Sequence, residues 1–253
     1  MSSGLTNQPA AIPPLADRPS ELMPQSVSSP SGMSDAESLA PQWLLSRISL
    51  RELRRRMWHI APGFLPFILW YYPHRDPISP TLRWILILIV VGLATWMITR
   101  FGRIRRKGEV NGTTAVVGYS ASVLATLFLF PAHAEIGLAV LAILAFGDGS
   151  ATLGGLLLRG PALPWNGDKS WAGLMSFIGA GLPMTTIIYW GETHNLEALD
   201  PGVSLTTALC CVAPAVMAAS LVESIRSRLN DNLRVGLTSA CAIFIARGFL
   251  LGW

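Results

Sequence analysis

The chain has 253 residues, of which 51% are hydrophobic and 13% are charged, and its mean hydropathy is +0.45. This composition excludes an ordinary soluble domain, in which about 25% of residues are charged. The net charge of +4 does not indicate nucleic-acid binding, because Lys and Arg occur in short clusters between apolar runs. Cys210, Cys211 and Cys241 lack the spacing of a zinc site or a disulfide framework. We therefore expect an integral membrane protein with no nucleic-acid partner.

The N-terminal region divides into two segments of different composition. Residues 1–42 are rich in Pro and Ser and predict a disordered tail without a secretory signal or an Arg-rich organelle transit peptide. Residues 43–56 alternate arginines with apolar side chains, which predicts a basic amphipathic segment at the membrane interface. The transmembrane domain is expected over residues 57–253.

Seven apolar runs follow in the transmembrane domain, several of them close to the ~20 residues that cross ~30 Å of hydrocarbon. Pro62 and Pro66 interrupt the first run, which is tolerable where neighbouring groups satisfy the freed carbonyls. The pattern predicts an all-α, polytopic membrane bundle of about seven transmembrane helices. The approximate limits of the runs are 57–73, 84–99, 112–130, 134–158, 171–190, 205–222 and 235–252.

The distribution of basic residues predicts the orientation, because Lys and Arg are retained on the cytoplasmic side of a membrane. With the N-terminus cytoplasmic, the inside segments contain sixteen of the nineteen Lys and Arg residues. The outside loops contain only Arg75 and Arg83, and Arg247 lies within the last run. We expect a multi-pass protein with a cytoplasmic N-terminus, in a bacterial inner membrane.

Asp148 is the first candidate functional residue, because it lies inside an otherwise apolar run. A buried charge there costs several kcal/mol unless it is paired, hydrated or bound to a metal, so it favours a function over a structural role. Glycines on both sides of Asp148 would allow another helix, a metal or a phosphate to approach the backbone closely. The alternative is a polar residue at a tight helix crossing.

Two further groups are expected on the same side of the membrane as Asp148. Lys169 and Ser170 stand at a helix start, where free backbone N–H groups and an ammonium suit a phosphate, although Lys at a boundary is also a common membrane anchor. Asp231 and Asn232 offer oxygen ligands for a hard cation, or form a solvated polar loop. Asp148 and Asp231 would form a Mg²⁺ site if their helices converge.

The remaining candidates have open roles. His59 follows Arg55 by four residues, so the two share a helix face, either at a site or in interfacial packing. Gly112 and Thr113 open the third run, where they line a nucleotide or head-group pocket or cap a helix. Arg247 is expected to pair with a carboxylate or a lipid phosphate.

The ordered set of these motifs over residues 50–252 resembles the family of dolichol kinases, phytol kinases and CTP-dependent diacylglycerol kinases, which is related to the phosphatidate cytidylyltransferases. The motifs are Arg55-Arg56-x-x-His59, Glu109-x-x-Gly112-Thr113, Gly147-Asp148-x-x-Ala151-x-x-Gly154, Lys169-Ser170-x-x-Gly173, and Glu223 with Asp231-Asn232.

The resemblance implies an enzyme that uses CTP and Mg²⁺ to phosphorylate a lipid alcohol such as a polyprenol, phytol, farnesol or diacylglycerol. Asp148 and Asp231 would hold the metal, and Lys169 and Ser170 the phosphates. Gly112, Thr113 and Asn232 would add nucleotide contacts. Asp148, Lys169 and Asp231 are the expected catalytic residues, and the general base is either aspartate.

Two other functions stay open on the sequence. The first is cytidylyl transfer to phosphatidate, although the Ser-Pro-Lys-Lys-Thr-like signature associated with that reaction is absent. The second is a transporter whose Asp and glycine-rich helix mark a substrate path, although the charges cluster on one face and no inverted repeat is evident. The sequence leaves the oligomeric state open.

Overall fold

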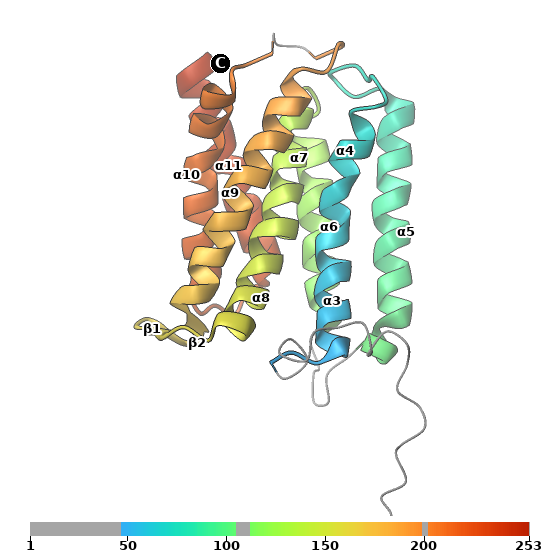
Figure 1. Ribbon diagram of the computed structural model, residues 1–253. Coiled ribbons are helices and arrows are strands. Elements are labelled where there is room, and N and C mark those ends of the chain that lie inside the picture. The colour runs from blue at the N-terminus through green and yellow to red at the C-terminus, as the bar shows by residue number, and fades with distance from the viewer. Residues whose placement is uncertain (1–46, 105–111, 199–201, 253) are drawn as a thin grey trace, which may run out of the picture. The chain divides into compact units, whose positions relative to one another are not determined.

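The computed structural model describes residues 47–104, 112–198 and 202–252, with the side chains of 101–104 and 112 excepted. The predicted tail 1–42 lies outside these residues. Figure 1 shows helices running side by side along one axis, with a two-stranded hairpin at one end. We call this end of the bundle the hairpin end, and the other end the loop end.

The helices of the described residues follow the predicted runs in chain order. They are α3 (Leu50–Ile60), the 3₁₀ helix η1 (Ala61–Phe64), α4 (Leu65–Leu69), α5 (Pro80–Ile104), α6 (Gly112–Leu129), α7 (Ala134–Ala142), the π-helix η2 (Ile143–Asp148), α8 (Gly149–Leu158), α9 (Trp171–Thr193), α10 (Leu205–Ser224) and α11 (Asp231–Leu251). The antiparallel hairpin of β1 (Ala162–Leu163) and β2 (Asn166–Ser170) connects α8 to α9.

The all-α, polytopic membrane bundle is confirmed. Among the described residues, five helical segments are long and apolar enough to cross a membrane, and α6 is a shorter apolar helix. The segments are Pro80–Arg100, Ala134–Leu158, Trp171–Thr193, Leu205–Ser224 and Asp231–Leu251. The first predicted run corresponds to α3, η1 and α4, where Pro62 and Pro66 lack the backbone N–H that a regular α-helix needs.

Side-chain caps decide where several helices begin. Ser49, Ser204 and Asn230 each accept a hydrogen bond from a backbone N–H in the first turn of α3, α10 and α11. Residues 50–56 of the predicted interfacial segment therefore form the first turns of α3, which continues into the first apolar run. For the same reason α11 begins at Asp231, four residues before the predicted run.

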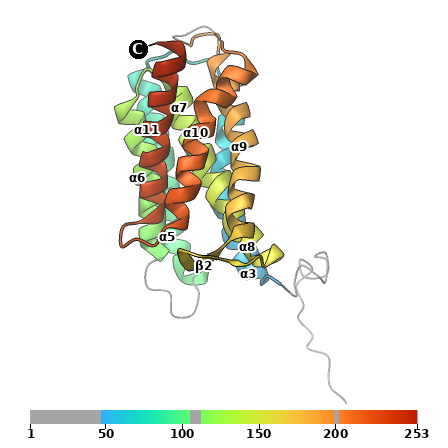
Figure 2. The same cartoon turned by 90° about the vertical axis from the view of Figure 1, so that its left-hand side faces the viewer.

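The core lies between α7, α9, α10 and α11, where apolar side chains such as Val140, Phe177, Val212 and Ile243 are fully buried. Figure 2 shows α9, α10 and α11 side by side above the hairpin. In contrast, none of the apolar window of α5 is buried inside the protein. An apolar helix that stays unburied is expected to face lipid.

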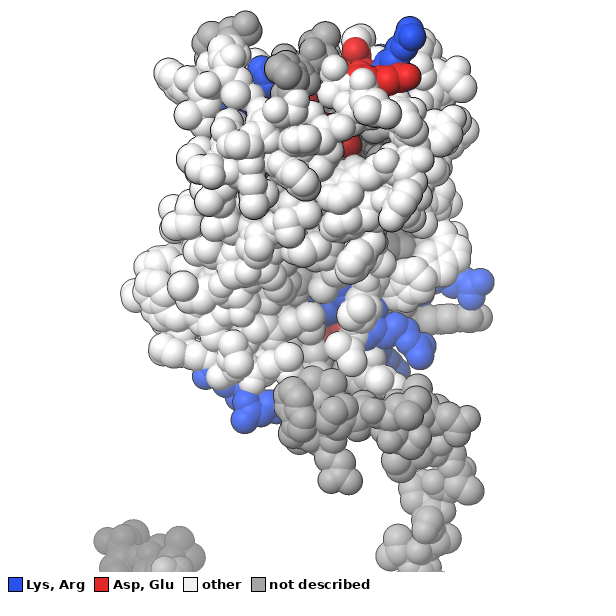
Figure 3. Space-filling view, turned by 45° about the horizontal axis from the view of Figure 1, so that its top comes forward, with Lys and Arg blue, Asp and Glu red and all other residues white. Residues whose placement is uncertain are grey.

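Charged side chains lie near the two ends of the bundle, with a broad uncharged surface between them (Figure 3). The chain alternates direction from helix to helix, so the arginine cluster of α3, the hairpin and the segment 225–230 all lie at the hairpin end (Figure 1). The described segments 70–79, 130–133, 194–198 and 202–204 lie at the loop end.

Candidate functional site

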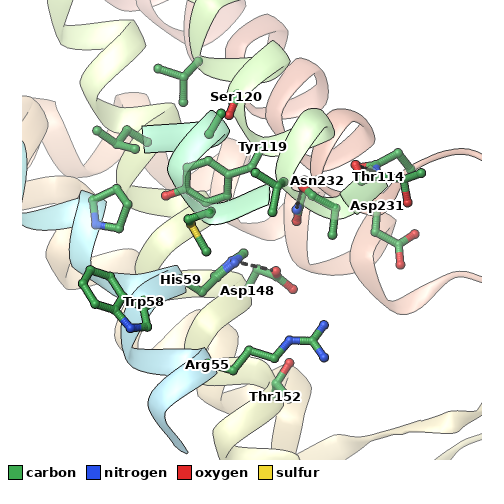
Figure 4. A pocket seen from close by; sticks show the side chains of 18 of the residues that line it. Arg55, Trp58, His59, Thr114, Tyr119, Ser120, Asp148, Thr152, Asp231 and Asn232 are labelled. Carbon is green, nitrogen blue, oxygen red and sulfur yellow. Dashed lines mark hydrogen bonds and ion pairs between the residues drawn. The ribbon is translucent and has the colours of Figure 1, made fainter. Parts of the chain in front are cut away.

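A cavity of about 700 Å³ opens at the hairpin end, between α3, α5, α6, η2, α8, β2 and the segment 227–232 (Figure 4). Its volume lies within the range of small-molecule binding sites. The side of the cavity formed by α5 is apolar. The charged side chains come from the elements opposite α5 and are Arg55, Arg56, Asp148, Lys169, Arg228 and Asp231.

Asp148 and His59 form a pair inside this cavity. His59 Nε2 lies 3.1 Å from Asp148 Oδ2 and 3.0 Å from the carbonyl oxygen of Leu144. Because both partners accept hydrogen bonds, a neutral His59 carries its proton on Nε2, and Nδ1 is left as a base. The edge of the imidazole packs against the Tyr119 ring, with the ring centroids 5.0 Å apart.

The local backbone brings Asp148 into the cavity and lets α3 approach it. Asp148 is the last residue of the π-helix η2, a rare element that is common at functional sites. A side chain at Gly149 would clash with Ile60, because its Cβ would lie 2.5 Å from Ile60 Cγ1. Glycine is therefore needed next to Asp148 for His59 to reach the carboxylate.

The small residues that follow Asp148 serve close helix packing. A Cβ on Gly154 would lie 1.9 Å from Ser176 Oγ, and a Cβ on Gly173 would lie 2.9 Å from the carbonyl oxygen of Ala151. Ser150 donates a hydrogen bond to the carbonyl oxygen of Ser176 at 2.9 Å. The sequence allowed another helix, a metal or a phosphate to approach these small residues. In the structure, the helix α9 packs against them.

Lys169 reaches the cavity from β2 and forms an ion pair with Glu223 at the end of α10. Glu223 is buried, whereas the Lys169 side chain is 34% exposed. Burial lowers the pKa of Lys169, but the Glu223 carboxylate raises it more, so the pKa lies above its usual range. The ammonium is therefore charged at neutral pH.

The hairpin is held against the end of α10 by neutral hydrogen bonds. Trp165 Nε1 donates to Ser224 Oγ at 3.0 Å, and Asn166 Nδ2 donates to the carbonyl oxygen of Ser224 at 2.9 Å. These bonds fix β2 and hence the position of the Lys169 backbone.

The start of α11 forms the remaining wall of the cavity. Asp231 is half-exposed and pairs with Arg234 at 3.2 Å. The Asn232 amide donates to the carbonyl oxygen of Ala115 at 2.8 Å, which ties α11 to α6. Asn230 caps α11 with its side-chain oxygen and donates to the carbonyl oxygen of Thr114.

The structure brings six of the sequence candidates together around the cavity. They are Arg55, His59, Asp148, Lys169, Asp231 and Asn232. Glu223 lies behind Lys169 as its ion-pair partner.

Four other candidates are not among the residues that line the cavity. Ser170 uses its hydroxyl to cap α9, accepting a hydrogen bond from the Gly173 N–H at 3.2 Å. Gly112 and Thr113 precede Thr114, which does line the cavity. Arg247 lies at the loop end, where it pairs with Glu135.

Sequence reasoning missed Tyr119, Asn230 and the role of Arg228. The Tyr119 hydroxyl is buried and has no hydrogen-bond partner in the described part of the chain, so it is available to a ligand. No local pattern marks Tyr119, because it lies in the middle of an apolar helix. Asn230 could have been found as an N-cap before the last helix. In the sequence, Arg228 is one of several basic residues that indicate orientation.

A metal ion at this site would need ligands in addition to the described side chains. Among the described residues, no group of three or more His, Cys, Asp or Glu side chains could hold a metal ion by itself. Mg²⁺ is usually bound by one or two carboxylates together with substrate phosphates. Asp148 and Asp231 both line the cavity and provide such a pair.

The chain is similar to curated plant lipid kinases. It is 26% identical to phytol kinase 1, chloroplastic, of Arabidopsis thaliana over 79% of this chain and 68% of the relative. It is 27% identical to probable phytol kinase 2, chloroplastic, of Oryza sativa over 75% and 64%, and 31% identical to farnesol kinase, chloroplastic, of Arabidopsis thaliana over 50% and 41%. No protein-family model and no solved structure matches the chain.

The matched region spans 41% to 68% of the length of these three relatives. Their names place them in the chloroplast and give no support to the expectation of a bacterial inner membrane. The phytol and farnesol kinases share the family that the sequence motifs resemble. The chain is thus a homologue of proteins named as phytol and farnesol kinases.

Proposed function

We propose that the protein is a lipid alcohol kinase that transfers the γ-phosphate of CTP, with Mg²⁺, to a single-chain isoprenoid alcohol such as phytol or farnesol. The observation that carries the proposal is the cavity at the hairpin end, which combines a carboxylate–histidine pair, several cations and an apolar wall. The relatives named as phytol and farnesol kinases support the class of reaction.

The cationic side of the cavity suits the triphosphate. Arg55, Arg56, Lys169 and Arg228 surround a space that also contains Asp148 and Asp231. Phosphoryl transfer requires positioning and neutralisation of charge more than covalent chemistry by the protein. The Lys169 ammonium and the guanidinium groups would bind the phosphates and orient the γ-phosphorus towards the alcohol.

Asp148 and Asp231 would hold the divalent cation together with the phosphate oxygens. The cation would supply further neutralisation of the charge that develops on the transferring group. Arg234 pairs with Asp231 and orients its carboxylate at the mouth of the cavity.

His59 is the residue we assign to the alcohol proton. The sequence left the general base between the two aspartates, but the Asp148 carboxylate is hydrogen-bonded to His59 Nε2. In this arrangement Asp148 orients the imidazole, and Nδ1 can accept the proton as the oxygen attacks. Tyr119 packs against His59 and has a hydroxyl available to the alcohol or to a phosphate oxygen.

The proposal includes an orientation. The arginines of α3, together with Lys169 and Arg228, lie at the hairpin end, and this end would face the cytoplasmic or stromal compartment that supplies the nucleotide. The alcohol would enter from the bilayer.

The test uses protein purified in detergent, Mg²⁺, and CTP labelled at either the α or the γ phosphorus. The panel contains geraniol, farnesol, phytol, diacylglycerol and phosphatidate. We expect label from the γ position in an isoprenoid alcohol. Label from the α position in a lipid product of phosphatidate would instead identify a cytidylyltransferase. Absence of transfer, together with solute flux into proteoliposomes, would identify a transporter.

A further inference from the structure

A second, narrower cavity of about 70 Å³ continues from the site cavity towards the loop end. The two cavities share four lining residues, Leu65, Val90, Val123 and Leu141, which come from α4, α5, α6 and α7. We call the second cavity the chain cavity. It is therefore an extension of the site and not a separate pocket.

One face of α5 lines both cavities. Leu82, Leu86 and Ile89 line the chain cavity, Val90 lines both, and Leu93 and Met97 line the site cavity. These positions recur at intervals of three and four residues, which is the spacing of one face of an α-helix. A single apolar stripe thus runs from the loop end to the charged site.

The walls of the chain cavity are almost entirely apolar. The lining comes from α4, α5, α6, α7 and the segments 70–79 and 130–133, and its polar members are His74, Thr126 and His133. A ligand that fills it must be a hydrocarbon, because a polar group buried there would lose its hydrogen bonds to water.

The geometry also limits the number of hydrocarbon chains. The chain cavity is one tenth of the volume of the site cavity that it joins, about 70 against 700 Å³. On the lipid side it is walled by α5, whose apolar window is not buried inside the protein.

We infer that the chain cavity binds the tail of one isoprenoid chain, whose hydroxyl reaches the His59–Asp148 pair, and that the α5 stripe sets the accepted chain length. The inference rests on the proposed function for the identity of the hydroxyl-bearing head. It excludes a two-chain lipid such as diacylglycerol as the preferred substrate.

The test places a bulky side chain at two levels of the stripe. Leu86→Trp fills the chain cavity about one helical turn closer to the site than Leu82→Trp. The matched control is Leu88→Trp, which lies on the same helix with a side chain that is 68% exposed and lines neither cavity. The measured quantity is the ratio of kcat/KM for phytol to kcat/KM for geraniol, with γ-labelled CTP.

We expect Leu86→Trp to lower this ratio by about tenfold, because the phytol tail loses buried apolar contacts that the shorter geraniol tail does not make. Leu82→Trp should lower it less, and Leu88→Trp should leave it at the wild-type value. The inference would be overturned if Leu86→Trp lowered kcat/KM equally for phytol and geraniol. It would also be overturned if Leu86→Trp and Leu88→Trp changed the ratio equally. Preference of the wild-type protein for diacylglycerol over phytol would also overturn it.

A photo-crosslinking arm separates this inference from the proposed function. A phytol analogue with a diazirine at the tail end is irradiated with the purified protein, without nucleotide, and the labelled peptides are identified by mass spectrometry. Label on α5 or α7 near Leu82 and Gly137 supports the chain cavity even if CTP proves to be the wrong donor. Label confined to the lipid-facing side of α5 around Leu88 would contradict it.

Discussion

Charged side chains are buried at both ends of the bundle, but the two ends differ in the space around those charges. At the loop end, His74 Nε2 lies 2.8 Å from Glu192 Oε1, and Arg247 Nε lies 3.3 Å from Glu135 Oε1. All four side chains are at most 8% exposed. At the hairpin end, Asp148, Lys169 and their neighbours surround a cavity of about 700 Å³.

The cavity beside Arg247 and Glu135 has a volume of about 10 Å³, which is about one water molecule and leaves no room for a substrate. The loop-end charges tie the segment 70–79, α7, α9 and α11 together. The comparison shows that burial of a charge in a membrane span does not by itself indicate a binding site. A cavity next to the charge is also needed, and for this reason Arg247 has a structural role.

The largest expected effect is on turnover at the hairpin end. Asp148→Asn should lower kcat by about 10³-fold, because the His59 orientation and a metal ligand are lost together. Thermal unfolding in detergent should change little. The matched control is Asp168→Asn on the exposed hairpin, whose pair with Arg226 is 71% exposed on both sides and contributes little. Equal activity of Asp148→Asn and the wild-type protein would remove Asp148 from the reaction.

The ion pair of Lys169 and Glu223 at the hairpin end is expected to contribute both to activity and to stability. Lys169→Met should reduce activity and also lower the free energy of unfolding by about 3 kcal/mol, because Glu223 is left buried without its partner. The double variant Lys169→Met/Glu223→Gln should recover stability and remain inactive. Recovery of activity in the double variant would show that Lys169 acts only by neutralising Glu223.

The loop end should show the opposite pattern. Arg247→Met should lower the free energy of unfolding by about 3 kcal/mol, because the Glu135 carboxylate loses its guanidinium partner. The activity per folded molecule should equal that of the wild-type protein. A change in KM for the nucleotide in this variant would show that the two ends are coupled.

The last expected effect is a dependence of stability on pH, which acts only over a limited pH interval. The hydrogen bond to Glu192 raises the pKa of His74 to about 9 from 6.5, and burial raises the pKa of Asp76 to about 7 from 3.8. Both groups bind protons more tightly in the folded state than in the unfolded state. The free energy of unfolding therefore decreases as pH rises through the range in which each group titrates. The His74 contribution, about 3 kcal/mol, is complete below pH 6.5 and is lost as pH rises through about 9.

Thermal unfolding in detergent at several pH values checks this dependence. The melting temperature of the wild-type protein should fall between pH 6.5 and 9, and His74→Gln should show a smaller fall over the same interval. An identical slope in His74→Gln would assign the dependence to other groups.

Much of the fold was predictable because the membrane imposes a simple rule on the sequence. Each span requires a long apolar run, so the number and order of helices followed from hydropathy. The helices begin at their N-cap residues and not at the limits of the apolar runs, as Ser49 and Asn230 show at α3 and α11. Residues 50–56 of the predicted interfacial segment belong to α3, which continues from its cap into the first apolar run.

The candidate site was only partly predictable. Isolated charges such as Asp148 are visible in an apolar sequence, since each must have a reason to be there. The π-helical turn before Asp148 and the buried hydroxyl of Tyr119 leave no comparable pattern. Ser170 matched a phosphate-binding pattern, but the same pattern describes the N-cap that it forms.

By itself, the sequence determined that the chain is a helical membrane protein, which helices it contains, and which few ionisable residues require an explanation. These properties depend on local composition and on the cost of transferring a charge into hydrocarbon. Only the tertiary structure decided which of those residues share a cavity. His59 and Asp148 are 89 positions apart in the sequence, and their contact depends on how α3 packs against Gly149. Arg247 is as unusual in the sequence as Asp148, but it pairs with Glu135 where there is no space for a ligand.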